Sequence, residues 1–136
     1  MKTWRVAIGS RIEGLTLGDE TPARPDANQV RVRIRATSLN YRDLMVVNGW
    51  YPVTTKAPLV PGSDGAGEVL EIGTAVTRFK PGDRVATSFF PNWVEGRMAP
   101  ARIAGALGGG DAGTFSEEIV LDERALVHSP AHLSYT

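Results

Sequence analysis

A strict alternation of apolar and basic residues constrains the fold of this chain more than any other feature. Residues 30–36 contain four apolar positions separated by three arginines: Val30, Val32, Ile34 and Ala36, with Arg31, Arg33 and Arg35 between them. A period of two places the apolar side chains on one face of a β-strand and the arginines on the other face. The segment therefore predicts a strand with a core face and a basic face.

The arginine row is compatible with phosphate binding or with simple exposure to solvent. Lysine and arginine together number 15, and so do aspartate and glutamate, so the net charge is zero. A protein that binds nucleic acid through such a strand ordinarily has an excess of positive charge and aromatic residues interleaved with the basic ones; this chain has no net charge, and its arginine row has no aromatic residue. We therefore expect a solvated strand face, no nucleic-acid partner, and a neutral or small molecule as the partner.

Other segments repeat the β pattern at short intervals. Residues 4–8 and 15–17 predict a half-buried antiparallel pair, and residues 69–72, 84–90, 115–121 and 125–127 predict further strands. Lys80-Pro81-Gly82-Asp83 places proline and glycine where a type II turn prefers them. The 136 residues, with 15 glycines and 9 prolines spread among them, predict one mainly β domain of seven or eight short strands.

Two segments interrupt the β pattern. Residues 40–47 do not alternate, Asn40 suits a helix N-cap, and Asn48-Gly49 suits a helix end, so a short helix is predicted there. Residues 91–113 contain six glycines and two prolines with little periodicity. Because long loops in compact domains are more often functional than idle, this loop is expected to line a cleft.

The chain has no cysteine, which excludes disulfides, thiolate metal sites and a cysteine nucleophile. We expect a soluble protein of a reducing compartment, the cytoplasm. No apolar stretch approaches the roughly 20 residues of a membrane span, so no membrane partner is expected. His128 and His132 are the only histidines, and Pro130 breaks any helix that would pair them, so no metal site is predicted.

Two glycine- and serine-containing segments resemble catalytic or binding motifs only superficially. Residues 62–67 hold three glycines but precede a strand, whereas a dinucleotide loop must lead into a helix. Tight turns and close backbone packing explain these glycines better. Ser63-Asp64 lacks an adjacent base and the spacing of a nucleophile elbow, so hydrolase chemistry is not expected.

A polar and aromatic group surrounds the predicted helix: Asn40, Tyr41, Asp43, Trp50 and Tyr51. Such side chains can hydrogen-bond a carboxamide or carbonyl and stack on a planar ring. A capping asparagine and core aromatics would explain the same residues almost as well. From the residues alone, both a cleft wall and a structural role stay open.

Several ordered motifs together resemble the medium-chain dehydrogenase/reductase superfamily. They lie in residues 30–36, 40–43, 58–69, 79–85, 113–118 and 133–136, and cover nearly the whole chain. The resemblance implies a GroES-like, partly open β-barrel with short helices over residues 1–136. It also implies that residues 130–136 begin the connection to a Rossmann domain, which these 136 residues do not contain.

The chain departs from the zinc-dependent members of that superfamily. Zinc alcohol dehydrogenases have cysteine where Asn40 stands, and histidine and glutamate where Ser63 and Asp64 stand; the four-cysteine structural zinc loop is absent too. The resemblance therefore moves to the zinc-free quinone oxidoreductase-like branch, in which NADPH passes hydride to a quinone, enone or carbonyl acceptor. Met45 stands where some relatives of that branch have a second tyrosine.

The resemblance also assigns roles to single residues. It implies that Asn40 and Tyr51 are catalytic, and that the cofactor contacts are made by Asn40, Tyr41, Asp43, Ser63 and Asp64. Most of NAD(P)H would be bound by the Rossmann domain, and a homodimer is left open. Alone, residues 1–136 are expected to be inactive.

Two functions follow from these observations. The first is the catalytic domain of a zinc-free NAD(P)H-dependent oxidoreductase; the second is a stand-alone, non-catalytic binding module with the same fold. Exposed surface discriminates between them. A catalytic domain should expose a sizeable apolar patch where the rest of its enzyme packs, whereas a stand-alone module should be polar there or covered by a partner.

Overall fold

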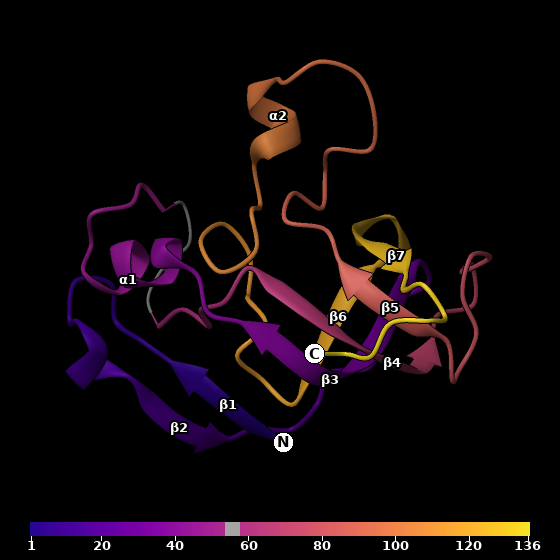
Figure 1. The fold of residues 1–136 in the computed structure, drawn as a ribbon, viewed down its shortest axis with the longest axis horizontal. Coiled ribbons are helices and arrows are strands. Elements are labelled where there is room, and N and C mark those ends of the chain that lie inside the picture. Colours follow the sequence, from indigo (N-terminus) through magenta and orange to yellow (C-terminus); the bar gives the residue numbers. More distant parts are fainter. Residues whose placement is uncertain (54–57) are drawn as a thin grey trace.

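The computed structural model describes residues 1–53 and 58–136, and within these ranges it contains two antiparallel sheets (Figure 1). The two-stranded sheet pairs β1 (Lys2–Arg5) with β2 (Thr16–Asp19). The five-stranded sheet has the order β6-β3-β4-β5-β7. Its strands are β3 (Gln29–Ser38), β4 (Asp64–Ile72), β5 (Arg84–Thr87), β6 (Glu118–Asp122) and β7 (Leu126–His128).

The helices are short: α1 (Tyr41–Val47), α2 (Pro100–Ile103), and the 3-10 turns η1 (Ile12–Gly14) and η2 (Glu123–Ala125). None of the helices in the described ranges has the length and apolar character needed to cross a bilayer. Strands β6 and β7 are the two edges of the large sheet and do not pair with each other, so the sheet is not closed. The predicted mainly β, partly open architecture is confirmed.

Strand β3 forms the middle of the core, as its alternation predicts. Val30 and Val32 are completely buried and face residues of β4 and β6 in register, with Val30 opposite both Ile72 and Leu121. The core around them consists of Val30, Val32, Val69, Phe79, Val85, Leu107, Ile119, Leu121, Ala125 and Leu126. Burial of these side chains is the main force that holds the sheet together.

The basic face of β3 is paired with acidic side chains on the neighbouring strands. Arg31 lies 2.8 Å from Glu71 and 3.1 Å from Glu118, and Arg35 lies 3.1 Å from Glu68. Such cross-strand pairs contribute only about 0–1 kcal/mol each when exposed to solvent. Two of the three arginines on this face, Arg31 and Arg35, are therefore paired with acidic side chains of the neighbouring strands.

Strand β4 begins five residues earlier than its apolar pattern predicts, at Asp64 instead of Val69. Its glycines pack against the neighbouring backbone: a Cβ on Gly67 would lie 2.0 Å from the carbonyl oxygen of Arg33. Close approach of two backbones explains why glycine stands inside this strand. The rejection of a phosphate loop in residues 62–67 agrees with this packing.

The N-terminal strand pair forms as predicted, but the prediction that Trp4 and Leu17 face the core is wrong. Thr3 and Val6 are buried, whereas Trp4 is 42% exposed and its cross-strand partner Leu17 is 51% exposed. The inward position is held by Thr3, whose hydroxyl hydrogen-bonds that of Ser116 at 2.9 Å. The outer, apolar side of the pair therefore faces a groove instead of the core.

Helix α1 follows its predicted limits. The carboxylate of Asp43 accepts a hydrogen bond from the backbone N–H of Asn40 at 2.8 Å, and Gly49 after the helix has φ 74°. Acidic side chains at this position satisfy free backbone donors at a helix start. A second core holds the helix in place through Val6, Val46, Val47 and Leu59.

Residues 88–113 form an arm that projects from the large sheet and carries α2 (Figure 1). Strand β5 ends at Thr87, three residues before the predicted end at Phe90, because residues 88–90 bend away into this arm. The segment 91–113, predicted as an irregular loop, contains the four-residue helix α2. Pro100 at the first position of α2 suits a helix start.

Candidate active site

Three polar side chains meet where β3 ends and β4 begins. The amide of Asn40 donates to the carboxylate of Asp64 at 2.7 Å and to the hydroxyl of Ser63 at 3.4 Å. The hydroxyl of Ser63 donates to the same carboxylate oxygen of Asp64 at 2.7 Å. Because β3 and β4 are neighbours with Ser38 opposite Asp64, the pairing register itself brings these residues together.

Asp43 lies beneath this network and is only 7% exposed. Burial raises the pKa of its carboxyl group, and the hydrogen bond from the backbone of Asn40 and the charge of Arg42 oppose that shift. The nearby charge of Asp64 adds to the increase in pKa. Asp43 thus fixes the backbone of Asn40 at the cost of holding a carboxylate in a poorly solvated place.

The backbone of Asp64 is anchored by two threonines that the sequence did not single out. The hydroxyls of Thr37 and Thr114 lie within hydrogen-bond distance of the carbonyl oxygen of Asp64, at 2.8 and 3.1 Å, and 2.8 Å from each other, so their two hydrogens are shared among these three contacts. Thr114 is 1% exposed, so its contact with Asp64 is made inside the protein, whereas Thr37 reaches the same carbonyl from the surface. The anchor sets the direction in which the side chain of Asp64 points.

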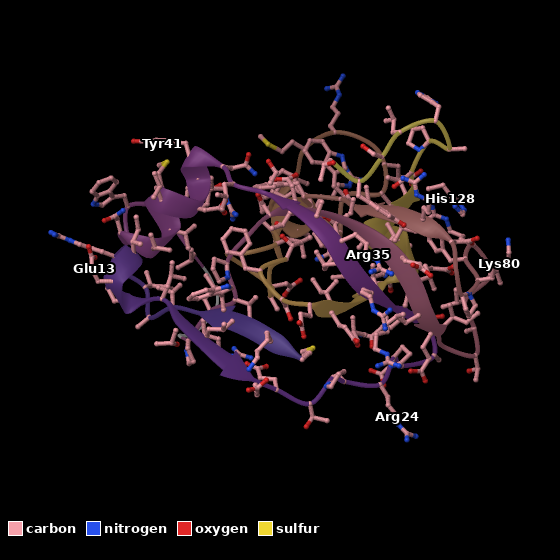
Figure 2. All side chains as sticks on the ribbon, turned by 60° about the horizontal axis from the view of Figure 1, so that its bottom comes forward. Glu13, Arg24, Arg35, Tyr41, Lys80 and His128 are labelled. Carbon is pink, nitrogen blue, oxygen red and sulfur yellow. The ribbon has the colours of Figure 1, made fainter. Side chains whose placement is uncertain are left out.

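Two aromatic candidates stand outside the network. Tyr41 is 70% exposed and Trp50 is 66% exposed. Figure 2 shows Tyr41 at the outer edge of the molecule, directed away from the body. Leu39, on the other side of Asn40, is exposed as well. Leu39 and Tyr41, the two sequence neighbours of Asn40, are therefore both exposed.

Tyr51 belongs to a neighbouring cavity and is linked to α1 through Arg42. The Arg42 guanidinium lies 4.5 Å from the centre of the Tyr51 ring, and the ring packs against the core under α1. The structure thus brings together Asn40, Asp43, Ser63 and Asp64, and places Tyr51 to one side of them. No local pattern in the sequence singles out Arg42 beyond its place between Tyr41 and Asp43.

The two histidines take no part in the site. His128 lies on β7, where its ring packs 4.7 Å from that of Phe79, far from Tyr41 in Figure 2. Within residues 1–53 and 58–136, no three histidine, cysteine, aspartate or glutamate side chains gather as a metal site would require. The polar groups that meet at the site are the amide of Asn40, the hydroxyl of Ser63 and the carboxylate of Asp64.

Comparison with known proteins places these features in a family. Residues 26–131 match the model of the alcohol dehydrogenase GroES-like domain. The chain is 42% identical to a zinc-type alcohol dehydrogenase-like protein of Schizosaccharomyces pombe over 116 residues, which are 85% of this chain and 34% of that protein. It is 40% identical to a quinone oxidoreductase of Pseudomonas aeruginosa over 126 residues, 90% of this chain and 31% of that protein.

Solved structures agree with the sequence relatives. A protein of Sinorhizobium meliloti 1021, solved as a candidate alcohol dehydrogenase, superposes with a TM-score of 0.89 at 34% identity, and the match covers 98% of this chain and 40% of that one. The chain spans about a third of the length of the two curated relatives. It belongs to the alcohol dehydrogenase GroES-like family, and with it to the medium-chain dehydrogenase/reductase superfamily.

Proposed function

We propose that this chain is the acceptor-binding domain of an NAD(P)H-dependent oxidoreductase that works without zinc and passes hydride to a quinone, enone or carbonyl compound. The observation that carries the proposal is the network of Asn40, Ser63 and Asp64. Asn40 and Ser63 both donate to one carboxylate oxygen of Asp64, and Asn40 also donates to Ser63. These are the positions where the resembled zinc alcohol dehydrogenases have cysteine, histidine and glutamate. Family membership supports an oxidoreductase parent.

The chemistry of the polar groups at the site supports a reaction without zinc. Catalytic zinc is held by three protein ligands, mostly thiolates, imidazoles and carboxylates. A carboxamide, a hydroxyl and one carboxylate that hydrogen-bond one another do not match that set. No step of the proposed reaction passes through a metal.

The polar network fits the nicotinamide end of the cofactor. A nicotinamide ring carries a carboxamide, which needs a donor and an acceptor beside an apolar surface. Asn40, Ser63 and Asp64 supply the donors and acceptors. When bound, the cofactor supplies the hydride. Asp43 keeps Asn40 in position from below.

The residues of this chain would then orient the acceptor and exclude water. Tyr51 and the cavity beside it are the place for the acceptor, because the ring is held by Arg42 at one side of the network. Holding two reactants in register accounts for a large part of the rate enhancement in such reactions. No strong acid or base of this chain is required.

An exposed apolar groove favours the catalytic-domain function over the stand-alone module. It has a volume of about 510 Å³ and runs along the outer side of the β1–β2 pair. Its apolar lining consists of Trp4, Leu15, Leu17, Ile34, Ala36, Leu39 and Phe115. A protein that stands alone seldom leaves such a surface uncovered. We propose that further chain, including a Rossmann domain, accompanies residues 1–136; a homodimer and a cytoplasmic location stay predictions.

Two measurements test the proposal. The intact mass of the natural gene product should exceed twice 14.6 kDa, because a Rossmann domain of typical length would add more than this domain's own mass. Within that product, Asn40→Ala and Tyr51→Ala should lower the rate of NAD(P)H oxidation while the unfolding temperature changes little. A product of 14.6 kDa, or full activity in both variants, would contradict the proposal and favour a binding module.

A further inference from the structure

A second hollow, separate from the apolar groove, lies between α1 and the arm of residues 88–113. Its volume is about 360 Å³. Most of its wall is apolar, with Tyr51, Pro52, Phe90 and Ile103 as the larger side chains and backbone glycines between them. Arg42 is the one charged side chain among the described residues that line it. Cavities that bind small molecules commonly combine an apolar wall with a few polar groups in this way.

The guanidinium of Arg42 is held between two aromatic rings. Its central carbon lies 4.5 Å from the centre of the Tyr51 ring and 4.8 Å from that of Phe89. One nitrogen, Nη1, donates to the carbonyl oxygen of Leu107 at 2.9 Å. Stacking of this kind fixes the orientation of the planar group without using its other N–H groups.

The remaining nitrogens of Arg42 have no acceptor. Nε and Nη2 are buried and hydrogen-bond to no residue in the described ranges, and none of the carboxylates there forms an ion pair with this arginine. A buried donor without a partner costs about 1–3 kcal/mol, and more when it is charged. An acceptor that enters the cavity would recover that cost.

Gly109 sets the position of these free donors. A Cβ at this residue would lie 2.3 Å from Nη2 of Arg42, so the guanidinium occupies the space that a side chain at 109 would fill. Gly109 and Gly110 both line the cavity, which leaves backbone alone between the guanidinium and the hollow on that side. Replacing Gly109 would therefore displace the guanidinium directly.

Two acidic residues lie near the cavity, and neither forms an ion pair with Arg42. Asp43 is the neighbour of Arg42 in sequence, and the charge of Arg42 acts to lower the pKa of its carboxyl group. One oxygen of Asp43 accepts a hydrogen bond from the backbone N–H of Asn40. Asp111 lies behind Gly105, close to where a Cβ on that residue would be, and does not line the cavity. Burial raises the pKa of the Asp111 carboxyl group, so this group becomes protonated and uncharged at a higher pH than an exposed aspartate does.

We propose that this cavity binds a small organic carboxylate, or the carboxylate group of a larger acceptor, through the free N–H groups of Arg42. A guanidinium presents paired donors that match the two oxygens of a carboxylate. Both nitrogens are covered by protein, so ligand entry requires the guanidinium to shift within its own plane, between the two rings, and present them to the hollow. As a statement about the acceptor the inference rests on the proposed function, since Tyr51 belongs to both; binding itself requires no cofactor.

Butyrate and butyramide are suitable probes, because they share shape and differ in charge. Isothermal titration calorimetry of the protein should give saturable binding of butyrate and at least about tenfold weaker binding of butyramide. Arg42→Met should lose butyrate binding by a similar factor. Arg78→Met is the matched control, since Arg78 also lies over an aromatic ring, Phe79 at 5.1 Å, but is exposed and outside the cavity.

Equal binding of the two probes, unchanged butyrate affinity in Arg42→Met, or no saturable binding of butyrate would each overturn the inference. If Arg42→Met does not fold, the Nε–H resonance of Arg42 in the wild-type protein replaces it. The chemical shift of that resonance should change on titration with butyrate and stay constant with butyramide. A chemical shift that butyrate does not change overturns the inference as well.

The same probes separate this inference from the proposed function. Butyrate binding through Arg42 in a gene product that oxidises no NAD(P)H with any quinone, enone or carbonyl acceptor would uphold the cavity and remove the hydride-transfer proposal. Hydride transfer at normal rates in a protein that binds no butyrate would do the reverse.

Discussion

The side-chain amide of Asn40 donates a hydrogen bond of 2.7 Å to the carboxylate of Asp64, although the two residues are 24 positions apart. The bond joins the residue that begins α1 to the residue that begins β4. Ser63 donates to the same oxygen, so the carboxylate of Asp64 is the acceptor on which the network converges.

Asn40→Asp would turn this donor into a second carboxylate facing the first. Two carboxylates at hydrogen-bond distance cannot both ionise without repulsion. We expect the variant to lose roughly 1–3 kcal/mol of unfolding free energy near pH 8 and to regain part of it below pH 5, where one carboxyl group is protonated. Urea unfolding at both pH values measures this. Asn28→Asp, in an exposed turn, is the control; an equal loss there would contradict the account.

Asp43 provides a second test through its pH dependence. Burial raises the pKa of its carboxyl group in the folded protein above the value in the unfolded chain. Between those two values the folded protein binds more protons, so the contribution of Asp43 to stability falls as the pH rises through the raised pKa. Asp43→Asn keeps an acceptor for the Asn40 backbone but cannot ionise.

The difference in unfolding free energy between Asp43→Asn and the wild type should therefore shift in favour of the variant as the pH increases from below 4 to neutral. Urea unfolding over a series of pH values gives this difference. A shift in favour of the wild type over the same range would mean that the pKa of Asp43 is lowered in the folded state.

Thr114 anchors the backbone of Asp64 from inside the protein. Thr114→Val keeps the shape but removes the hydroxyl that lies within hydrogen-bond distance of the Asp64 carbonyl and of the Thr37 hydroxyl. We expect a loss of about 1–3 kcal/mol in unfolding free energy. Thr16→Val, on exposed strand β2, should change stability by less than about 0.5 kcal/mol. An equal loss of unfolding free energy in the two variants would show that the buried hydroxyl of Thr114 contributes no more to stability than the exposed hydroxyl of Thr16.

Gly67 tests the close contact between β3 and β4. An alanine Cβ there would lie 2.0 Å from the carbonyl oxygen of Arg33, so the two strands would have to separate. We expect Gly67→Ala to destabilise by about 1–3 kcal/mol or more. Gly18→Ala, where nothing lies within 4 Å of the added Cβ, is the control for glycine in a strand. Thermal unfolding of the two variants decides the matter, and similar unfolding temperatures would contradict the packing described here.

The parts of the fold that depend on local chemistry could be predicted from the sequence. The alternation of residues 30–36 predicts β3 and its two faces, Asn40 predicts the start of α1, and Gly82, with φ 89°, fits the predicted type II turn. Each of these signals lies within a few neighbouring residues. Period, capping and turn geometry act over that range.

The parts that depend on distant contacts could not be predicted. Thr114 reaches Thr37 across 77 residues, and Phe89 lies over Arg42 although the two are remote in sequence. The exposure of Trp4 is decided by Thr3, whose partner Ser116 lies 113 residues away. Tertiary packing overrides local pattern at such positions.

The resemblance of the motifs predicts roles for Asn40, Asp43, Ser63 and Asp64, where the residues alone left their roles open. Asn40, Asp43, Ser63 and Asp64 gather because β3 and β4 are adjacent, which no spacing in the sequence reveals. The same resemblance placed Tyr51 with them, but the structure links it to Arg42 and the neighbouring cavity.

Zinc-free hydride transfer is tested by the rate of NAD(P)H oxidation by the natural gene product, with a quinone or enone acceptor, before and after exhaustive removal of zinc with a chelator. The proposed function predicts an unchanged rate after chelation and, in Asn40→Ala, a rate lowered about tenfold or more. Loss of activity on chelation that added zinc restores, or no oxidation with any acceptor, would contradict it.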